Sequence, residues 1–322
     1  MRSRLSPERI AYARSAVGGV LVDGFFRHTS RLASLHPKAR PEAHGVVVER
    51  DVVYSRSRGT ANSLDVWRPR EAKGPLPIVL YVHGGGFRIL SKDTHWVMAL
   101  SFARQGFLVF NIDYRLAPEH RYPAALEDCA EAYAWVAENA ARHGGDLSRL
   151  VLAGESAGAN LVTSMAIAAS YERSEPFAKR IFDTGVVPRA VLPACGIFQV
   201  SDVERFGRRR RLPTWLMDRL VEVSSSYLPH GDEKAELAHP VVVLERGERP
   251  ARPLPPFFLP CGTKDPLLDD TRRLGKALEA LGAKAEVAIY PGEPHAFHAF
   301  VFREQARRCW RDSFRFLDRA LV

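Results

Sequence analysis

A serine between two glycines is the residue of this chain with the clearest capacity for chemistry. Ser156 stands between Gly154 and Gly158, after the apolar run 150–153 and before a helix-like run that begins at Ala159. A strand, a tight turn and a helix in this order suit a nucleophilic serine, because the strained turn pushes its hydroxyl into a cleft. Side chains at the two glycines would be expected to collide with neighbouring backbone. We interpret Ser156 as a nucleophile, with a chance Gly-Ser-Gly turn as the alternative.

A glycine-rich segment supplies what the intermediate of serine attack needs. Three glycines follow His83, at the end of the apolar run 77–82. Backbone N–H groups stabilise an oxyanion well where no side chain blocks the approach, and a glycine loop after a strand offers such a surface. A merely flexible loop is the alternative. We choose the amides of Gly85 and Gly86 as donors. Ala157 should add a third donor, helped by the positive end of its helix.

An acidic residue near the C-terminal third could orient a catalytic base. Asp265 follows the strand-like run 256–259, at the end of a strand where open α/β sheets hold their sites. It would accept a hydrogen bond from a histidine Nδ1–H and favour the imidazolium. Asp269 and Asp270 are rivals, but they fall in what reads as a first helical turn. Acids are favoured there by the helix dipole, and we assign both that structural role.

Two histidines compete for the role of the base. His295 follows Pro294 in a loop after the strand-like run 285–290, whereas His298 is expected to open the last helix. Loop placement after the last strand favours His295. The order of serine, aspartate and histidine along the chain is then that of the α/β hydrolases, and differs from the chymotrypsin and subtilisin orders.

Two further segments carry a resemblance to a known family. Residues 113–120 read Asp-Tyr-Arg-Leu-Ala-Pro-Glu-His, and residues 122–128 read Tyr-Pro-Ala-Ala-Leu-Glu-Asp. With the glycine and serine segments, they make residues 64–316 resemble the hormone-sensitive-lipase-like esterases, or bacterial family IV carboxylesterases, apart from an interrupting cap. The resemblance implies Ser156 as nucleophile, His295 as base, Asp265 as its orienting acid, and the Gly85, Gly86 and Ala157 amides as oxyanion donors.

The chain departs from that family at two positions. Glu155 stands in the serine segment where many members have aspartate, so the charge is kept and a methylene is added. We carry over no detailed role for it. Ala296 stands where many members have glycine after the histidine, which we expect to matter little.

Strand-like and helix-like runs alternate along most of the chain. The strand-like runs are residues 46–54, 64–67, 77–82, 107–113, 150–153, 190–198, 256–260 and 285–290. The helix-like runs are residues 96–105, 124–142, 159–171 and 271–281, with a last helix through Phe302 and Phe314. This alternation predicts an α/β protein with a mainly parallel central sheet, helices on both faces and two early antiparallel strands. The resemblance implies the α/β-hydrolase fold with a helical cap.

The expected catalytic core comprises residues 46–200 and 244–322. Residues 201–243 are a polar insertion between late strands, in which 213–218 and 223–227 suggest helices, and by resemblance they form a cap with residues 1–45. Candidates for binding substrate are Phe87, Trp215 and Leu216, with Phe25, Phe26, Met217 and Tyr227 as further pocket-lining candidates. Packing of the cap against the core is an equally open role for the cap residues among them.

Composition narrows the remaining functions. The 322 residues include four scattered cysteines, Cys129, Cys195, Cys261 and Cys309, which form no C-x-x-C pair and suggest reduced, buried thiols rather than disulfides or a metal site. The net charge of +9 and the run 208–211 of four arginines do not amount to a nucleic-acid motif. We expect neither a cofactor nor a metal, and no nucleic-acid partner.

The N-terminal segment mimics a signal peptide only in part. The apolar run 16–22 is too short to span a bilayer, charged residues precede it, and no clear cleavage site follows. Residues 7–35 read better as amphipathic helices. We therefore expect a cytoplasmic enzyme without stable membrane insertion. A homodimer paired through the last helix and strand is one arrangement that the resemblance allows.

The expected function is that of a serine carboxylesterase. The substrate would be a small-molecule ester with a short- to medium-chain acyl group, a preference that rests on the family resemblance alone. A deacetylase or amidase, or an acyltransferase with the same triad, remains an alternative. A non-catalytic ligand-binding module on the same fold is the other.

We predict that alanine at the two histidines will have opposite effects. Ser156→Ala and His295→Ala should nearly abolish ester hydrolysis, because the first removes the nucleophile and the second removes the base that takes its proton. His298→Ala should retain activity. Steady-state hydrolysis by the three purified variants checks this, and an inactive His298→Ala beside an active His295→Ala would reverse the assignment.

Overall fold

The computed structural model describes residues 23–24, 27–56, 62–209, 211–228 and 235–322. Residues 27–34 are helical, within the N-terminal range expected to be helix. The predicted pocket residues Phe25 and Phe26 lie outside the described residues, as does the whole segment 1–22 that mimics a signal peptide. Among the residues that the structure describes, no helix is both long and apolar enough to cross a membrane.

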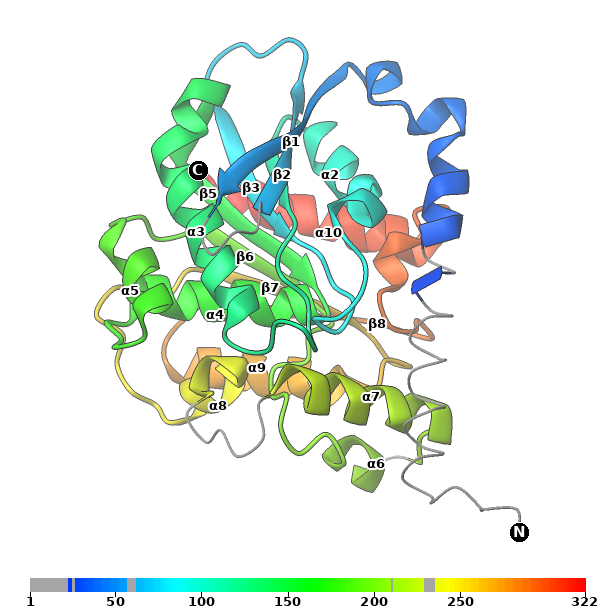
Figure 1. Ribbon diagram of the computed structural model, residues 1–322, viewed down its shortest axis with the longest axis vertical. Coiled ribbons are helices and arrows are strands. Elements are labelled where there is room, and N and C mark those ends of the chain that lie inside the picture. Colours follow the sequence, from blue (N-terminus) through cyan, green and yellow to red (C-terminus); the bar gives the residue numbers. More distant parts are fainter. Residues whose placement is uncertain (1–22, 25–26, 57–61, 210, 229–234) are drawn as a thin grey trace.

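The described core is built on an eight-stranded sheet in the order β1-β2-β4-β3-β5-β6-β7-β8 (Figure 1). The strands are β1 (Val46–Ser55), β2 (Asn62–Pro69), β3 (Leu76–Val82), β4 (Leu108–Ile112), β5 (Gly145–Glu155), β6 (Ala190–Ala194), β7 (Phe257–Gly262) and β8 (Ala285–Tyr290). β2 runs antiparallel to β1 and β4, and the other neighbours are parallel. The predicted mainly parallel sheet with early antiparallel strands is confirmed.

Helices cover both faces of this sheet, as its side-chain alternation requires. Ile78 and Leu80 of β3 join one apolar cluster, whereas Val79 and Tyr81 join the other, because successive side chains of a strand point to opposite faces. The first cluster packs against α3 (Ala124–Asn139), α4 (Ala157–Ser170), α5 (Pro176–Asp183), α8 (Pro240–Glu245) and α9 (Leu268–Ala280). The second packs against α2 (Trp96–Ala103) and α10 (Glu304–Ala320).

The register of the parallel strands brings the predicted site segments to one edge. Val82 pairs with Gly154, Glu155 with Ala194, and Gly262 with Tyr290, and each is at or within a residue of its strand's carboxyl end. Parallel strands share the direction of their chains, so the loops that follow them emerge together. The segments that carry His83, Ser156, Asp265 and His295 therefore meet at the carboxyl edge of the sheet.

The chain between β6 and β7 leaves the sheet and forms α6 (Arg205–Arg209), α7 (Thr214–Tyr227), a short 3₁₀ helix (Glu236–Ala238) and α8. Figure 1 shows α6 and α7 together at the end of the molecule away from β1 and β2. The two helical stretches expected here form one helix, α7. β6 is shorter than predicted and ends at Ala194, because Cys195 has a left-handed backbone with φ of 41°.

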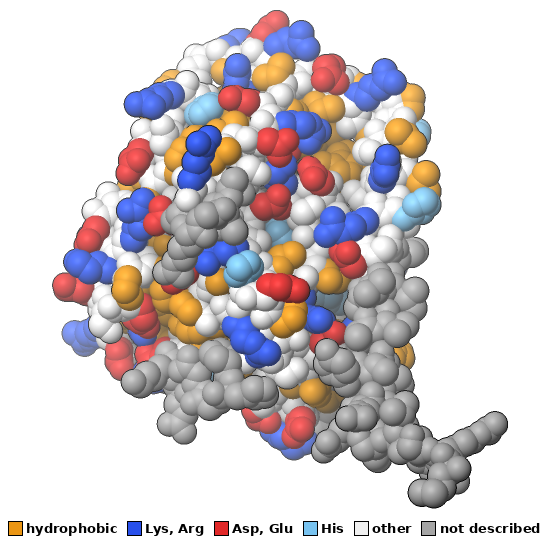
Figure 2. Space-filling view, viewed as in Figure 1, with side chains coloured by type: hydrophobic (Ala, Val, Ile, Leu, Met, Phe, Trp, Pro, Cys, Tyr) orange, Lys and Arg blue, Asp and Glu red, His pale blue; other side chains and the backbone are white. Residues whose placement is uncertain are grey.

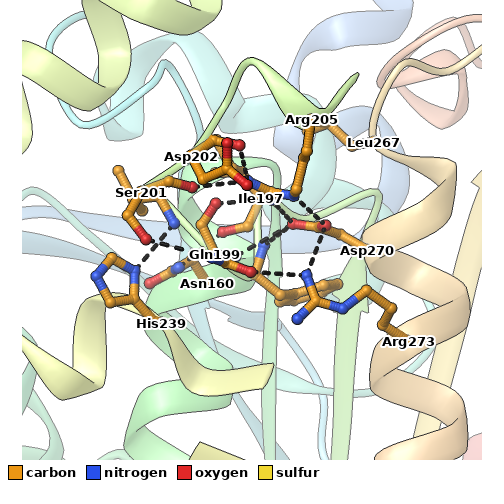
Figure 3. Close-up of polar contacts among 12 residues, drawn as sticks. Asn160, Ile197, Gln199, Ser201, Asp202, Arg205, His239, Leu267, Asp270 and Arg273 are labelled. Carbon is orange, nitrogen blue, oxygen red and sulfur yellow. Dashed lines mark hydrogen bonds and ion pairs between the residues drawn. The ribbon is translucent and has the colours of Figure 1, made fainter. Parts of the chain in front are cut away.

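A buried ion pair fastens the start of this segment to the core. Asp270 in the first turn of α9 is fully buried, and its Oδ2 accepts hydrogen bonds from Arg205 at 2.6 Å and from the amides of Phe198 and Gln199. Figure 3 shows Arg205 and Arg273 approaching the carboxylate from α6 and α9. Asp270 thus does more than complement the helix dipole, which was its expected role.

Charged side chains are dispersed over the surface. Figure 2 shows Lys and Arg interspersed with Asp and Glu across the visible face. Arg208 of the four-arginine run forms an ion pair with Asp202 at 2.7 Å. All four cysteines are buried and free, which confirms the expectation of reduced, buried thiols.

We predict that Asp270→Asn will destabilise the fold. The substitution leaves the Arg205 guanidinium without its anionic partner in a largely buried setting, a loss of about 3–5 kcal/mol in free energy of unfolding. Urea denaturation of the purified variant measures this. Arg208→Gln removes a solvent-exposed pair nearby and should leave stability unchanged; equal stability of the two variants would refute the anchoring role of Asp270.

Candidate active site

The turn at Ser156 is strained and closely packed. Ser156 lies between β5 and α4 with φ of 55° and ψ of −115°, a conformation that residues with side chains rarely adopt. A Cβ atom added to Gly158 would lie 2.1 Å from the Val82 carbonyl oxygen, and one added to Gly154 would lie 2.6 Å from the same atom. Both expectations, of strain at the serine and collision at the glycines, are confirmed.

The glycine loop after β3 lies beside this turn. The Gly84 amide donates to Glu155 Oε1 at 2.8 Å, which ties the loop to the residue directly before Ser156. Gly85 has φ of 106°, and a Cβ there would lie 2.1 Å from the Ile89 carbonyl oxygen. On the outer side, Gly86 packs against Val223 of α7, whose Cγ2 would lie 2.6 Å from an added Cβ. The loop is therefore held between the sheet and α7.

Asp265 and His295 come together at the carboxyl edge. His295 Nδ1 lies 2.9 Å from Asp265 Oδ2, and Asp265 Oδ1 accepts the Leu267 amide at 2.8 Å. The Asp265 side chain is fully buried, whereas 36% of the His295 side chain is exposed. Burial alone would lower the pKa of His295, but the charge and hydrogen bond of Asp265 raise it overall.

The end of β6 connects this pair with the serine. The Ser156 amide donates to the Ala194 carbonyl at 2.9 Å. The next residue, Cys195, has its Sγ within 4.8 Å of donor atoms of Asp265 and His295. These three residues are a potential metal-ligand group, but the Asp265–His295 hydrogen bond already uses two of the donor atoms. Burial and the Asp265 charge raise the pKa of the Cys195 thiol, which disfavours a metal-binding thiolate.

His298, the rival base, is in a different environment. It lies in a short 3₁₀ helix (Phe297–Ala299), and α10 begins only at Glu304, so the expectation that it opens the last helix is wrong. Burial lowers its pKa to about 4. It borders a cavity of about 30 Å³, which is too small for an ester substrate. The left-handed φ of 52° at Ala296 turns the chain between the two histidines.

The family-like segments after β4 support the glycine loop. Arg115 pairs with the buried Asp128 at 2.8 Å and with Glu127 at 2.8 Å. Two residues further on, the Ala117 amide donates to the Phe87 carbonyl at 2.8 Å. A folded turn held by a buried ion pair thus fixes the outer end of the glycine loop.

The predicted substrate-binding residues differ in exposure. The Phe87 ring is fully buried and stacks on Tyr227 of α7 with centroids 3.7 Å apart. Trp215 is 65% exposed at the start of α7, and Leu216 beside it is half-buried. Met217 packs against the main core. Phe87 and Tyr227 therefore join α7 to the core, which is the packing role left open for the cap residues.

Sequence reasoning missed the two side chains that contact Glu155, the residue directly before the strained turn at Ser156. Glu155 Oε1 lies 2.6 Å from His95 Nε2, and Tyr81 donates its hydroxyl proton to Glu155 Oε2. Neither His95 nor Tyr81 belongs to a recognised motif segment. The available signal was a histidine and a tyrosine flanking the glycine loop, with an acid beside the serine.

The carboxyl edge of this sheet holds a strained serine, a glycine loop and a hydrogen-bonded acid–histidine pair. This combination defines an α/β hydrolase. The chain matches the family model of the alpha/beta hydrolase fold over residues 79–299. It is 32% identical over 282 residues to carboxylesterase NlhH of Mycobacterium tuberculosis. The alignment covers 87% of this chain and 83% of the relative.

Solved structures agree with this class. Esterase LipW from Mycobacterium marinum aligns with a TM-score of 0.78 at 27% identity, covering 98% of this chain and 96% of that chain. An esterase from the bacterial hormone-sensitive lipase family aligns with a TM-score of 0.69 at 27% identity, covering 86% of each chain. The chain belongs to the hormone-sensitive-lipase-like carboxylesterases of the α/β-hydrolase fold and is a carboxylic ester hydrolase.

We predict that His295 titrates above the ordinary histidine pKa of 6.5. The Asp265 carboxylate favours the imidazolium, so neutral His295 accumulates only as pH rises through the raised value. Asp265→Asn should lower this pKa, while His298 should stay neutral between pH 5 and 8 in both proteins. An NMR titration of the ring protons measures all three; an unchanged His295 pKa in Asp265→Asn would contradict the coupling.

Proposed function

We propose that the protein hydrolyses short- to medium-chain acyl esters through an acyl-enzyme on Ser156. His295 is the general base, and Asp265 orients it. The amides of Gly85, Gly86 and Ala157 hold the oxyanion. The observation that carries this proposal is the 2.9 Å hydrogen bond between His295 Nδ1 and Asp265 at the edge of the sheet where the strained Ser156 turn lies.

The proton follows a simple path in this mechanism. His295 takes the proton of Ser156 as its Oγ attacks the ester carbonyl, and the carbonyl electrons move to the oxygen that the amides hold. His295 then returns the proton to the departing alcohol as the acyl–oxygen bond breaks. Water repeats both steps on the acyl-enzyme and releases the acid.

The backbone supports the choice of donors. The Gly84 amide already donates to Glu155, so the next two amides of the loop, those of Gly85 and Gly86, are the proposed donors. Ala157 is the first residue of α4, where the helix dipole is positive. A negative charge that develops near these amides would be stabilised by hydrogen bonds fixed in advance.

The segment between β6 and β7 is proposed to act as the cap, together with the N-terminal residues. Residues 201–243 and 1–45 remain the proposed limits of its two parts. The contact of Val223 with Gly86 supports this role, because it brings α7 to the glycine loop. Arg88 and Glu222 form an ion pair beside that contact. The half-buried Leu216 and exposed Trp215 at the start of α7 are the proposed substrate contacts.

We predict that a fluorophosphonate probe labels the wild-type protein at Ser156. Labelling should vanish in Ser156→Ala, and hydrolysis of p-nitrophenyl esters should peak at short to medium acyl chains. Ser164→Ala is the matched control, since Ser164 lies in α4 and its hydroxyl donates to the Asn160 and Leu237 carbonyls. Folded wild-type protein that resists the probe, or Ser156→Ala that still accepts it, would refute the assignment.

A further inference from the structure

Glu155, the residue before the proposed nucleophile, is buried at 4% exposure and surrounded by hydrogen-bond donors. Its Oε1 accepts the Gly84 amide at 2.8 Å and faces His95 Nε2 at 2.6 Å, while Oε2 accepts the Tyr81 hydroxyl. An ionised carboxylate only accepts hydrogen bonds, and it suits this set of donors. Burial alone would raise the pKa of Glu155, yet the charge and hydrogen bond of His95, with smaller effects from His298 and the Tyr81 hydroxyl, lower it to about 2.

His95 is the cation that faces this carboxylate. Its Nε2 lies 2.6 Å from Glu155, and its Nδ1 lies 2.9 Å from Thr94 Oγ1 and 3.1 Å from the Ser91 carbonyl oxygen. The Thr94 hydroxyl donates its own proton to the Ser91 carbonyl at 2.7 Å, which leaves its oxygen as an acceptor. Both ring nitrogens therefore face acceptors and carry protons, and the ring is an imidazolium. Although burial alone would lower the pKa of His95, the Glu155 charge and hydrogen bond raise it overall.

The two other histidines near this pair are neutral. His83 stacks on Tyr114 with ring centroids 4.3 Å apart, and burial lowers its pKa to about 3. Burial likewise lowers the pKa of His298 to about 4. Of these neighbours in the described part of the chain, His95 is therefore the one that balances the Glu155 charge at neutral pH.

The location of this charge matters for the reaction. Glu155 directly precedes Ser156 in the chain. It also accepts the amide of Gly84, the neighbour of the proposed oxyanion donor Gly85. An uncompensated carboxylate here would repel the negative charge that develops on the substrate oxygen, since few water molecules screen charges in such a site. Fixing the loop with an anion thus requires a cation beside it.

We propose that the His95–Glu155 ion pair is a positioning device for the oxyanion loop. Glu155 fixes the Gly84 amide and thereby the direction of the Gly85 and Gly86 amides. His95 cancels the Glu155 charge, so that the anchor does not oppose the oxyanion. The inference rests on the proposed function of the loop and adds two positioning residues to it.

The test is a double-mutant cycle of His95→Gln, Glu155→Gln and the double variant. His95→Gln should lower kcat about 10–100-fold with KM changed by less than about threefold, because the oxyanion is destabilised and substrate binding is not. Adding Glu155→Gln removes the unbalanced anion, so the double variant should recover kcat relative to His95→Gln. A boronic acid inhibitor that mimics the tetrahedral intermediate should weaken in parallel with kcat.

Controls separate the outcomes. Asp146→Asn removes a carboxylate that pairs with Arg149 at the amino end of β5, away from the carboxyl edge that holds the site, and it should leave kcat and KM unchanged. A wild-type protein that neither labels with fluorophosphonate nor hydrolyses esters would sink the proposed function itself. If the wild type is active, two outcomes would overturn the positioning role alone. One is that the effects of the two single variants on kcat are additive in the double variant, and the other is that KM rises by as large a factor as kcat falls.

Discussion

The contact between the end of β3 and the turn at Ser156 determines the geometry of the whole site. The Val82 carbonyl lies against Gly154 and Gly158, where no side chain would fit. That contact requires β3 and β5 to be neighbours in the sheet, as they are. The next element, α4, starts at Ala157 directly after the turn, and all of its residues are buried. The strain at Ser156 persists because this packing leaves the turn no alternative.

Buried charge in pairs is the second theme of the molecule. Asp265 faces His295, Asp270 faces Arg205, Asp128 faces Arg115, and Glu155 faces His95, each with a separation under 3 Å. Carboxylates of this kind also accept backbone amides, which makes them anchors for loops that have no regular hydrogen-bonding partners. The site is thus assembled from irregular segments that four acids hold in place.

The sequence was sufficient for the parts that depend on local pattern. The alternation of strand-like and helix-like runs predicted the parallel sheet. The glycines on either side of a serine predicted the strained turn at Ser156. Long-range partners were not predictable, because Asp270 meets Arg205 across 65 residues and nothing nearby in the sequence marks the pairing. For the same reason the role of His95 was invisible. β6 was predicted too long, since the left-handed turn at Cys195 occurs in a residue type without such a preference.

The contact between Val223 and Gly86 has a consequence for how a bulky ester could enter. The glycine loop is bounded on its inner side by Glu155 and on its outer side by α7, which is also stacked through Tyr227 on Phe87. A shift of α7 away from the core would remove the outer wall of the loop. In the proposed mechanism, movement of α7 would therefore alter substrate access and the support of the oxyanion amides together.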